Sequence, residues 1–130
     1  MNRKNFIAYE GIYYTIEWYY NESGKSQSLD YLMKLKPGMQ RKVFYLFKRI
    51  CDNGKINDIT KFRNEGDKIY AFKPQFDRFL SFFVKDKTII ITNAFRKKTD
   101  KLPENEKAKA LKYREDYLQR VKEGKYYEKN

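Results

Sequence analysis

The spacing of the apolar residues changes several times along this chain, and each change predicts a new element of secondary structure. Residues 12–20, IYYTIEWYY, are mostly β-branched and aromatic and predict a first strand, which the polar residues 21–24 end as a turn. Ser28 is placed to cap a short helix that continues to Leu35. Pro37 stops that helix and suits the first turn of a second one.

The second predicted helix has one apolar face and ends at the pair Asn53-Gly54. The residues that form this face are Met39, Val43, Leu46, Phe47 and Ile50. Cys51 falls where the same pattern needs an apolar residue, so we expect it in the core. Because Cys51 is the only cysteine, no disulfide can form within the chain.

Three further strands are predicted after a connector at residues 55–66, which has room for a short strand of its own. Residues 68–73 and 76–84 meet across a tight turn as a hairpin, and a second tight turn leads into 89–95. The triple isoleucine that opens this last strand predicts a central position, buried on both faces of a sheet.

A final helix is predicted from Pro103 to about Lys122. Its apolar positions are sparse, which indicates that the helix lies on the surface; they are Ala108, Leu111, Leu118 and Val121. We expect the tail at 124–130 to be loose.

The order of elements is therefore strand, helix, helix, three strands, helix, which is typical of an α+β domain. Strands joined by short turns pair antiparallel, so the sheet is expected to be small and mostly antiparallel, with the helices packed on one face. The first strand must lie at an edge or beside the last strand. No linker or repeat divides the chain, so we expect a single domain over residues 1–130 with a core at about 12–122.

The charge of the chain favours a polyanionic partner. Its 130 residues include 29 Lys and Arg against 17 Asp and Glu, and the net charge is +12 at pH 7. Nucleic acid, an anionic membrane and an acidic protein all fit such a surplus. No segment approaches the ~20 apolar residues of a membrane helix, and the first nine residues are a poor signal peptide. The chain has no His, which excludes His-based acid–base catalysis and most zinc sites.

Cations gather around the predicted hairpin and after the last strand, where they favour RNA or DNA as the partner. They are Lys61, Arg63, Lys73, Arg78 and the run Arg96-Lys97-Lys98. If residues 74–77 form the hairpin loop, Lys73 and Arg78 lie opposite each other and point to the same face. The alternatives are ordinary: Lys97 and Lys98 also fit a solvated strand end, Arg78 a structural ion pair, and Phe95 the core.

Four segments resemble, in the same order, those of the RelE/ParE superfamily of bacterial toxins, and most closely its HigB-like, phage-derived branch. YTIEWYYNESGKSQSLDYLMKL is similar to that branch's first strand, its Gly-Lys-Ser turn and its first helix. KFRNEGDKIYAFK and DRFLSFF are similar to its second and third strands. IIITNAFRKKTDKLPENEKAKA is similar to its last strand, its Lys-Lys-Thr segment and its Ala-rich helix. The resemblance covers roughly residues 14–119.

The resemblance implies a RelE-like fold and a ribosome-dependent mRNA endoribonuclease that needs no metal or other cofactor. In that chemistry the ribose 2′-OH attacks the neighbouring phosphate, which leaves a cyclic phosphate and a 5′-OH. Carried over to this sequence, Lys73 and Arg78 stabilise the transition state, and Lys97 or Lys61 moves a proton or holds a second phosphate oxygen. The positions expected to bind RNA are Arg63, Phe95, Arg96 and Lys98.

This sequence departs from the branch at two positions. Asn93-Ala94 stand where a His is common, and Lys73 stands where an Arg is usual, which keeps the charge but not the bidentate fork. The resemblance also implies a cytoplasmic protein whose partners are the ribosome, mRNA and a helix-turn-helix antitoxin. Two alternatives stay open: a non-catalytic, ParE-like inhibitor of DNA gyrase, and a phage-borne RNA-binding module without cleavage activity.

Overall fold

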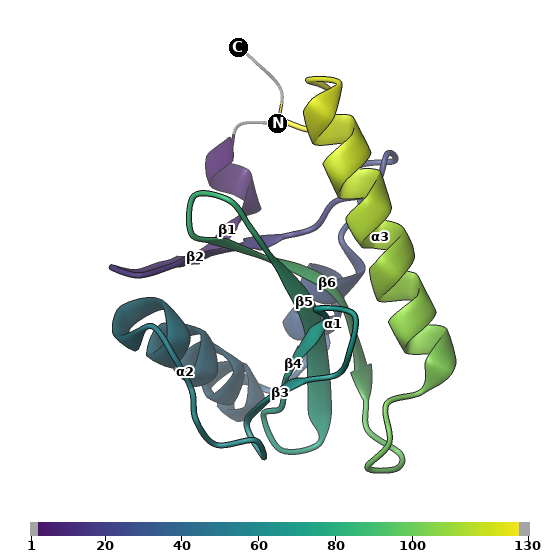
Figure 1. Ribbon diagram of the computed structural model, residues 1–130. Helices are drawn as coiled ribbons and strands as arrows, with labels where there is room; N and C mark the ends of the chain where they lie inside the picture. The colour runs from purple at the N-terminus through teal and green to yellow at the C-terminus, as the bar shows by residue number, and fades with distance from the viewer. Residues whose placement is uncertain (1–2, 128–130) are drawn as a thin grey trace.

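A computed structural model describes residues 3–127 as a sheet flanked by helices (Figure 1). After a short 3-10 helix at Arg3–Phe6, the elements in chain order are β1 Ile7–Glu10, β2 Thr15–Trp18, α1 Gln27–Lys34, α2 Pro37–Asn53, β3 Phe62–Asn64, β4 Tyr70–Phe72, β5 Asp77–Val84, β6 Thr88–Arg96 and α3 Glu104–Lys122. The predicted α+β class is confirmed. None of the helices in the described part of the chain is long and apolar enough to cross a bilayer.

The six strands form one sheet in the order β1-β2-β6-β5-β4-β3. The first predicted strand lies beside the last one, as expected, and this pair is parallel, with Ile16 opposite Ile89. All the other neighbours pair antiparallel. The short strand in the connector exists as β3, whereas β1 was not predicted, because its four residues, IAYE, are too few to show a period.

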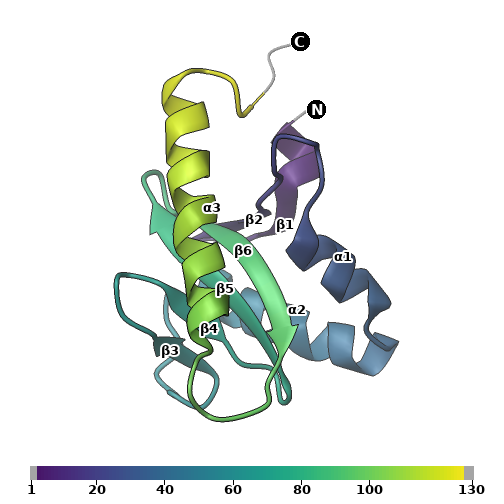
Figure 2. The same cartoon turned by 90° about the vertical axis from the view of Figure 1, so that its right-hand side faces the viewer.

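The helices cover both faces of the sheet, which corrects the expectation that they pack on one face (Figure 2). The reason lies in the strands themselves. In β6, Ile89 and Ile91 point into one buried cluster and Ile90 into another, and all three side chains are fully buried. A sheet that is apolar on both faces needs cover on both faces.

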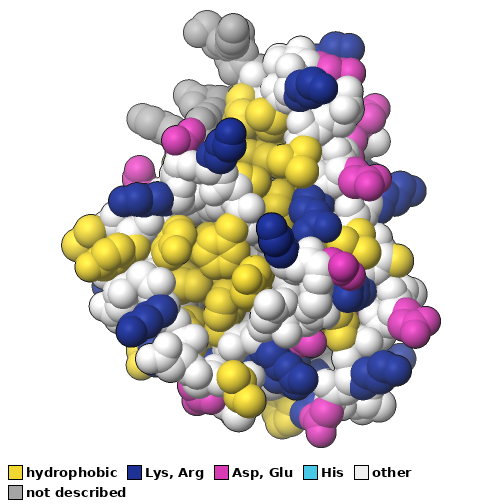
Figure 3. Space-filling model, viewed as in Figure 1, with side chains coloured by type: hydrophobic (Ala, Val, Ile, Leu, Met, Phe, Trp, Pro, Cys, Tyr) yellow, Lys and Arg dark blue, Asp and Glu magenta, His cyan; other side chains and the backbone are white. Residues whose placement is uncertain are grey.

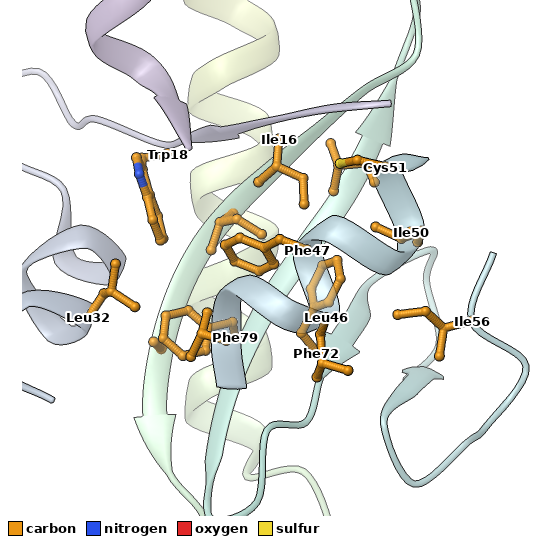
Figure 4. Close-up of a cluster of buried hydrophobic side chains, with 14 residues drawn as sticks. Ile16, Trp18, Leu32, Leu46, Phe47, Ile50, Cys51, Ile56, Phe72 and Phe79 are labelled. Carbon is orange, nitrogen blue, oxygen red and sulfur yellow. The ribbon is translucent and has the colours of Figure 1, made fainter. Parts of the chain in front are cut away.

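The α2 side of the sheet holds the larger core (Figure 4). Phe47 of α2 lies at its centre, with its ring centroid 5.0 Å from that of Phe72 and 5.8 Å from that of Trp18. The predicted apolar face of this helix is confirmed by the burial of Val43, Leu46, Phe47 and Ile50. Cys51 is also buried, as expected, and burial raises the pKa of its thiol to about 12, so it stays protonated.

The buried residues of α3 on this side are Ala110 and Tyr117; of the apolar residues that the sequence named, Leu111 packs against the same cluster. Leu118 and Val121 are 49% and 39% exposed, because Tyr117 carries the packing face and reaches Phe82 at a centroid distance of 5.7 Å. The tail is not loose where it is described, since Tyr126 is buried and its hydroxyl accepts a hydrogen bond of 3.0 Å from the main chain of Tyr20. Residues 128–130 of that predicted tail lie outside the described chain.

Both ends of α2 agree with the sequence, whereas the start of α1 differs. As predicted, Pro37 occupies the first turn of α2 and the helix ends at Asn53-Gly54; the structure shows Gly54 in a left-handed conformation at φ 87°. The cap of α1, however, is Ser26, whose hydroxyl accepts a bond from the Leu29 amide. Ser28 is instead buried against the sheet. Two serines, two residues apart, both satisfy the capping pattern, and packing decides between them.

Candidate functional site: a cationic site at the β4–β5 turn

The net charge does not by itself mark a binding site. Figure 3 shows hydrophobic side chains gathered over the middle of one face, with Lys and Arg dispersed among Asp and Glu around them. Individual contacts bring several of the cations that the sequence singled out together where β4 turns into β5.

Lys73 and Arg78 lie on the same face of the sheet, across the β4–β5 turn. Phe72 pairs with Phe79 in the register, so the next pair outward is Lys73 with Arg78. Ala71 and Leu80, two residues further into each strand, both pack in the cluster beneath α3. Because side chains alternate along a strand, Lys73 and Arg78 also point to the α3 side.

Arg78 is half-buried and held by main-chain carbonyls. Its Nη1 donates hydrogen bonds of 2.7 Å to the carbonyl oxygen of Gln75 and 2.9 Å to that of Asp77. Burial lowers the pKa of the guanidinium, while the negative charges of Glu65 and Asp100 oppose that shift. An arginine remains charged despite such a shift, so Arg78 is a fixed positive charge in a partly dry position.

The protonation of Lys73 depends on its burial and on the charges around it. Its Nζ donates a hydrogen bond of 3.3 Å to the carbonyl oxygen of Ile59. Burial lowers the pKa of Lys73, and repulsion from Arg78, Arg63 and Lys97 lowers it further, against attraction from Glu65. Lys73 therefore loses its proton more easily than an exposed lysine.

Two carboxylates accompany these cations. Glu65 lines a small hollow together with Arg78 and Phe95, and Asp100 lies on its rim and forms an ion pair of 2.8 Å with Lys97. Bonding to Lys97 lowers the pKa of Asp100. We call the four cations and two carboxylates the cationic site: Arg63, Lys73, Arg78, Lys97, Glu65 and Asp100.

Sequence reasoning missed Glu65 because it lies in the connector, where no period marks it. Its position depends on the reversal between β3 and β4, in which the Glu65 amide bonds to the carbonyl of Ile69 at 2.8 Å. The Glu65-Gly66 pair was the available signal, since Gly66 has a φ of 92° and marks a tight turn just before a strand.

The remaining predicted residues divide between the two faces. Phe95 pairs with Arg78 across β5 and β6 and lines the same hollow. The guanidinium of Arg96, the next residue, lies 5.2 Å from the centroid of the exposed Phe76 ring. Its positive charge also works to lower the pKa of Tyr31 in α1, so Arg96 belongs to the opposite face of the sheet. Lys98 is exposed in the loop after β6.

Lys61 is not part of the cationic site, although it is close in the backbone. The Lys73 amide bonds to the Lys61 carbonyl at 2.8 Å, yet the Lys61 side chain lines a separate groove against α2. Asn93, which stands where the resembling toxins often have His, is buried; its amide donates to the carbonyl and the carboxylate of Glu106 at 3.2 and 3.0 Å. Asn93 thus fastens β6 to α3.

The cationic site has the charge that suits a phosphodiester, with side chains beside it that can take or give a proton. Fixed positive charge stabilises the extra negative charge of a five-coordinate phosphorus. Glu65 supplies a proton acceptor and Lys73 a proton donor with a lowered pKa. Among residues 3–127 no group of three or more His, Cys, Asp or Glu is arranged to hold a metal ion.

Comparison with known proteins assigns the chain to a family. No curated protein matches the chain. Residues 30–115 match the family described as phage derived protein Gp49-like (DUF891). The matched stretch runs from within α1 into α3 and contains every residue of the cationic site. The chain therefore belongs to the Gp49-like family of phage-derived proteins.

Proposed function

We propose that this protein is the toxin of a type II toxin–antitoxin system and cleaves mRNA within the ribosome, without a metal ion. The observation that supports this most strongly is the cationic site itself. Lys73 and Arg78 face one another at a partly buried position with Glu65 beside them, on a chain of a phage-derived family that resembles RelE-like toxins. A purely structural ion pair has no need of a surplus of cations that repel one another.

The proposed reaction transfers a phosphoryl group within the RNA. The ribose 2′-oxygen forms a bond to phosphorus, and the bond from phosphorus to the 5′-oxygen of the next nucleotide breaks. The 2′-hydroxyl proton passes to a base, and a proton from an acid reaches the leaving 5′-oxygen. The products are a 2′,3′-cyclic phosphate and a 5′-hydroxyl, so every atom and charge is accounted for without another reactant.

The side chains of the cationic site divide these tasks by charge and position. Arg78 binds the non-bridging phosphate oxygens as negative charge develops on them. Lys73 donates the proton to the leaving oxygen, because its lowered pKa makes it a stronger acid than an ordinary lysine. Glu65 accepts the 2′-hydroxyl proton. Arg63 and Lys97 lie near Lys73 and hold the adjoining phosphate.

An antitoxin is the partner expected in the resting cell. A chain of net charge +12 that cleaves mRNA in the cytoplasm must be held inactive by the cell that makes it. We propose that an acidic segment of a helix-turn-helix protein covers the cationic site and neutralises it. The complex is then expected to weaken as salt rises, because exposed charges are screened. Expression from the native operon that yields only the isolated chain contradicts this proposal.

Controlled expression in bacteria tests the function directly. The wild-type chain should stop translation within minutes of induction, and mRNA ends mapped by primer extension should appear inside the coding regions. The matched variant Arg78→Ala should produce neither effect at equal protein level. Growth arrest with intact mRNA and blocked DNA supercoiling favours the gyrase alternative instead.

A further inference from the structure

A second group of cations lies on the other side of the β4–β5 turn, along the outer surface of α2. The groove there is lined by Arg41, Lys42, Tyr45, Arg49, Lys61 and Gln75. We call these six residues the α2 groove. Four of the six are positively charged and none is acidic. The cationic site, by contrast, mixes its cations with Glu65 and Asp100.

The α2 groove also carries an exposed aromatic ring. Tyr45 is 61% exposed, because the buried face of α2 is formed by its neighbours Leu46 and Phe47 and not by Tyr45. The guanidinium of Arg49 lies over the Tyr45 ring at 5.8 Å, one helical turn away. A ring held in this way and open on its outer side offers a flat surface to another planar group.

The cations of the groove are available to a ligand. Arg41 and Lys42 are exposed. Asp58 is not among the residues that line the groove, and it is bound by its own loop, since the hydroxyl and amide of Thr60 donate to it at 2.6 and 2.9 Å. The hydrogen bonds from Thr60 lower the pKa of Asp58 most, and the positive charges of Lys61 and Arg49 lower it less.

The α2 groove and the cationic site meet at Gln75. Its carbonyl accepts the 2.7 Å hydrogen bond from Arg78 on one side of the turn, and the residue lines the α2 groove on the other. The hydrogen bond from the Lys73 amide to the Lys61 carbonyl also connects a residue of the cationic site with a residue of the α2 groove. An extended ligand can therefore pass from one to the other around a single turn.

We propose that the α2 groove binds the single-stranded RNA that leads into the cationic site, with its cations on phosphates and one base stacked on Tyr45. This inference rests on the proposed function for the identity of the RNA, but it concerns binding and not cleavage. Cations that track a backbone beside an exposed aromatic ring form the usual surface for a single strand. An acidic protein segment would use the charges but has no need of the exposed ring.

The test measures binding of an oligonucleotide that cannot be cleaved. The probe is a single-stranded, fully 2′-O-methylated RNA of about ten nucleotides, within the site sizes of small single-strand binders. Its Kd is measured by fluorescence anisotropy over a range of salt concentrations. Because the probe lacks a free 2′-hydroxyl, the result is independent of whether the protein is a nuclease.

The double variant Arg41→Ala/Arg49→Ala should weaken binding and reduce the slope of log K against log salt by about 1.4, since each phosphate contact on a single strand contributes about 0.7. The matched control is Lys112→Ala/Lys122→Ala, which removes the same charge from exposed positions on α3 and should leave the slope unchanged. All four positions are on helices, where Ala is well tolerated, so folding is preserved.

Tyr45 gives an independent readout. Tyr45→Ala should weaken binding by about 5- to 150-fold, the usual range for loss of one stacked base, without changing the salt slope. Tyr45→Phe keeps the ring and should bind like the wild type. Equal slopes for the two double variants, or wild-type affinity in Tyr45→Ala, would overturn the proposal. Tighter binding of a poly-glutamate peptide than of the RNA would overturn it in favour of an acidic protein.

Discussion

The guanidinium of Arg78 is held at the β4–β5 turn by a 2.7 Å hydrogen bond to the carbonyl oxygen of Gln75. The second bond of Arg78, to the Asp77 carbonyl, also uses Nη1. Within residues 3–127 its Nε and Nη2 groups have no hydrogen-bond partner and are left to receive an anion. A guanidinium that is already positioned for a phosphate needs little reorganisation when negative charge develops on the phosphate oxygens.

Replacing Arg78 is expected to affect the cleavage step more than ribosome binding. Arg78→Ala should lower the single-turnover rate on programmed ribosomes by about 10²–10³-fold, or about 3–4 kcal/mol, the usual cost of one transition-state donor. Arg78→Lys should recover only part of that loss, because lysine keeps the charge without the fork. Lys112→Ala, on the exposed face of α3, is the control. Wild-type cleavage by Arg78→Ala contradicts the assignment.

The protonation of Lys73 should be visible in the pH profile of cleavage. Burial and the charge of Arg78 lower its pKa, and we propose that the protonated form is the acid. On the alkaline side, activity then falls as the pH rises through the pKa of Lys73 in the folded protein, at a pH below the ~10.4 of a free lysine. Lys73→Arg should move this alkaline decline to higher pH. The same decline in both proteins shows that another group titrates.

Tyr31 and Asp77 provide a stability test that is separate from function. Asp77 is fully buried, and the Tyr31 hydroxyl donates a hydrogen bond to its Oδ1; within the described chain its Oδ2 has no partner. Tyr31→Phe should lower the free energy of unfolding by about 1–3 kcal/mol, because a buried carboxylate loses a donor. Tyr45→Phe, at an exposed ring, should change it by less than about 0.5 kcal/mol. Equal urea midpoints for the two variants contradict this.

Asp116 should make the stability of the α3 contact depend on pH. Burial raises the pKa of its carboxyl, but hydrogen bonds from Arg120 and Tyr19 outweigh burial and lower the pKa. A carboxyl with a lowered pKa contributes fully above the unfolded value of about 3.9 and loses its contribution as the pH falls through the folded value.

Asp116→Asn should therefore lower the free energy of unfolding by about 1.5–3 kcal/mol at pH 7, the range for bonds to a charged group. The difference from the wild type should shrink as the pH falls below about 4. Denaturant titrations of both proteins at several pH values measure it. A difference that stays constant down to pH 2 shows that the carboxylate charge is not what stabilises this contact.

Much of the fold could be predicted because the strongest signals are local. The period of α2, the proline that begins it and the glycine that ends it all coincide with the structure. The hairpin itself was predicted, and its register, with Phe72 opposite Phe79, agrees with the condition of a four-residue loop at 74–77 and not with the two-residue turn between strands 68–73 and 76–84. The class of the fold needed only the order of such elements.

The errors have a different physical origin. The triple isoleucine already indicated that the last strand is buried on both faces, but the sequence does not state which helix covers the face of Ile90 and Leu80. The packing of α3 through Tyr117, and of the tail through Tyr126, relies on aromatic contacts between distant segments. The site also depends on contacts between distant segments. Glu65, which follows β3, lines the hollow beside Arg78, whereas Lys61, which precedes β3, lines the α2 groove.

We propose that this protein cleaves mRNA by attack of a 2′-hydroxyl inside the ribosome. The most direct measurement incubates the purified chain with mRNA on programmed ribosomes, without added metal beyond what the ribosomes need, and maps and characterises the new ends. We predict cuts within codons that leave a 2′,3′-cyclic phosphate and a 5′-hydroxyl, and no cuts with Arg78→Ala. Intact mRNA after incubation with the wild-type chain, together with inhibition of DNA gyrase, would contradict this proposal.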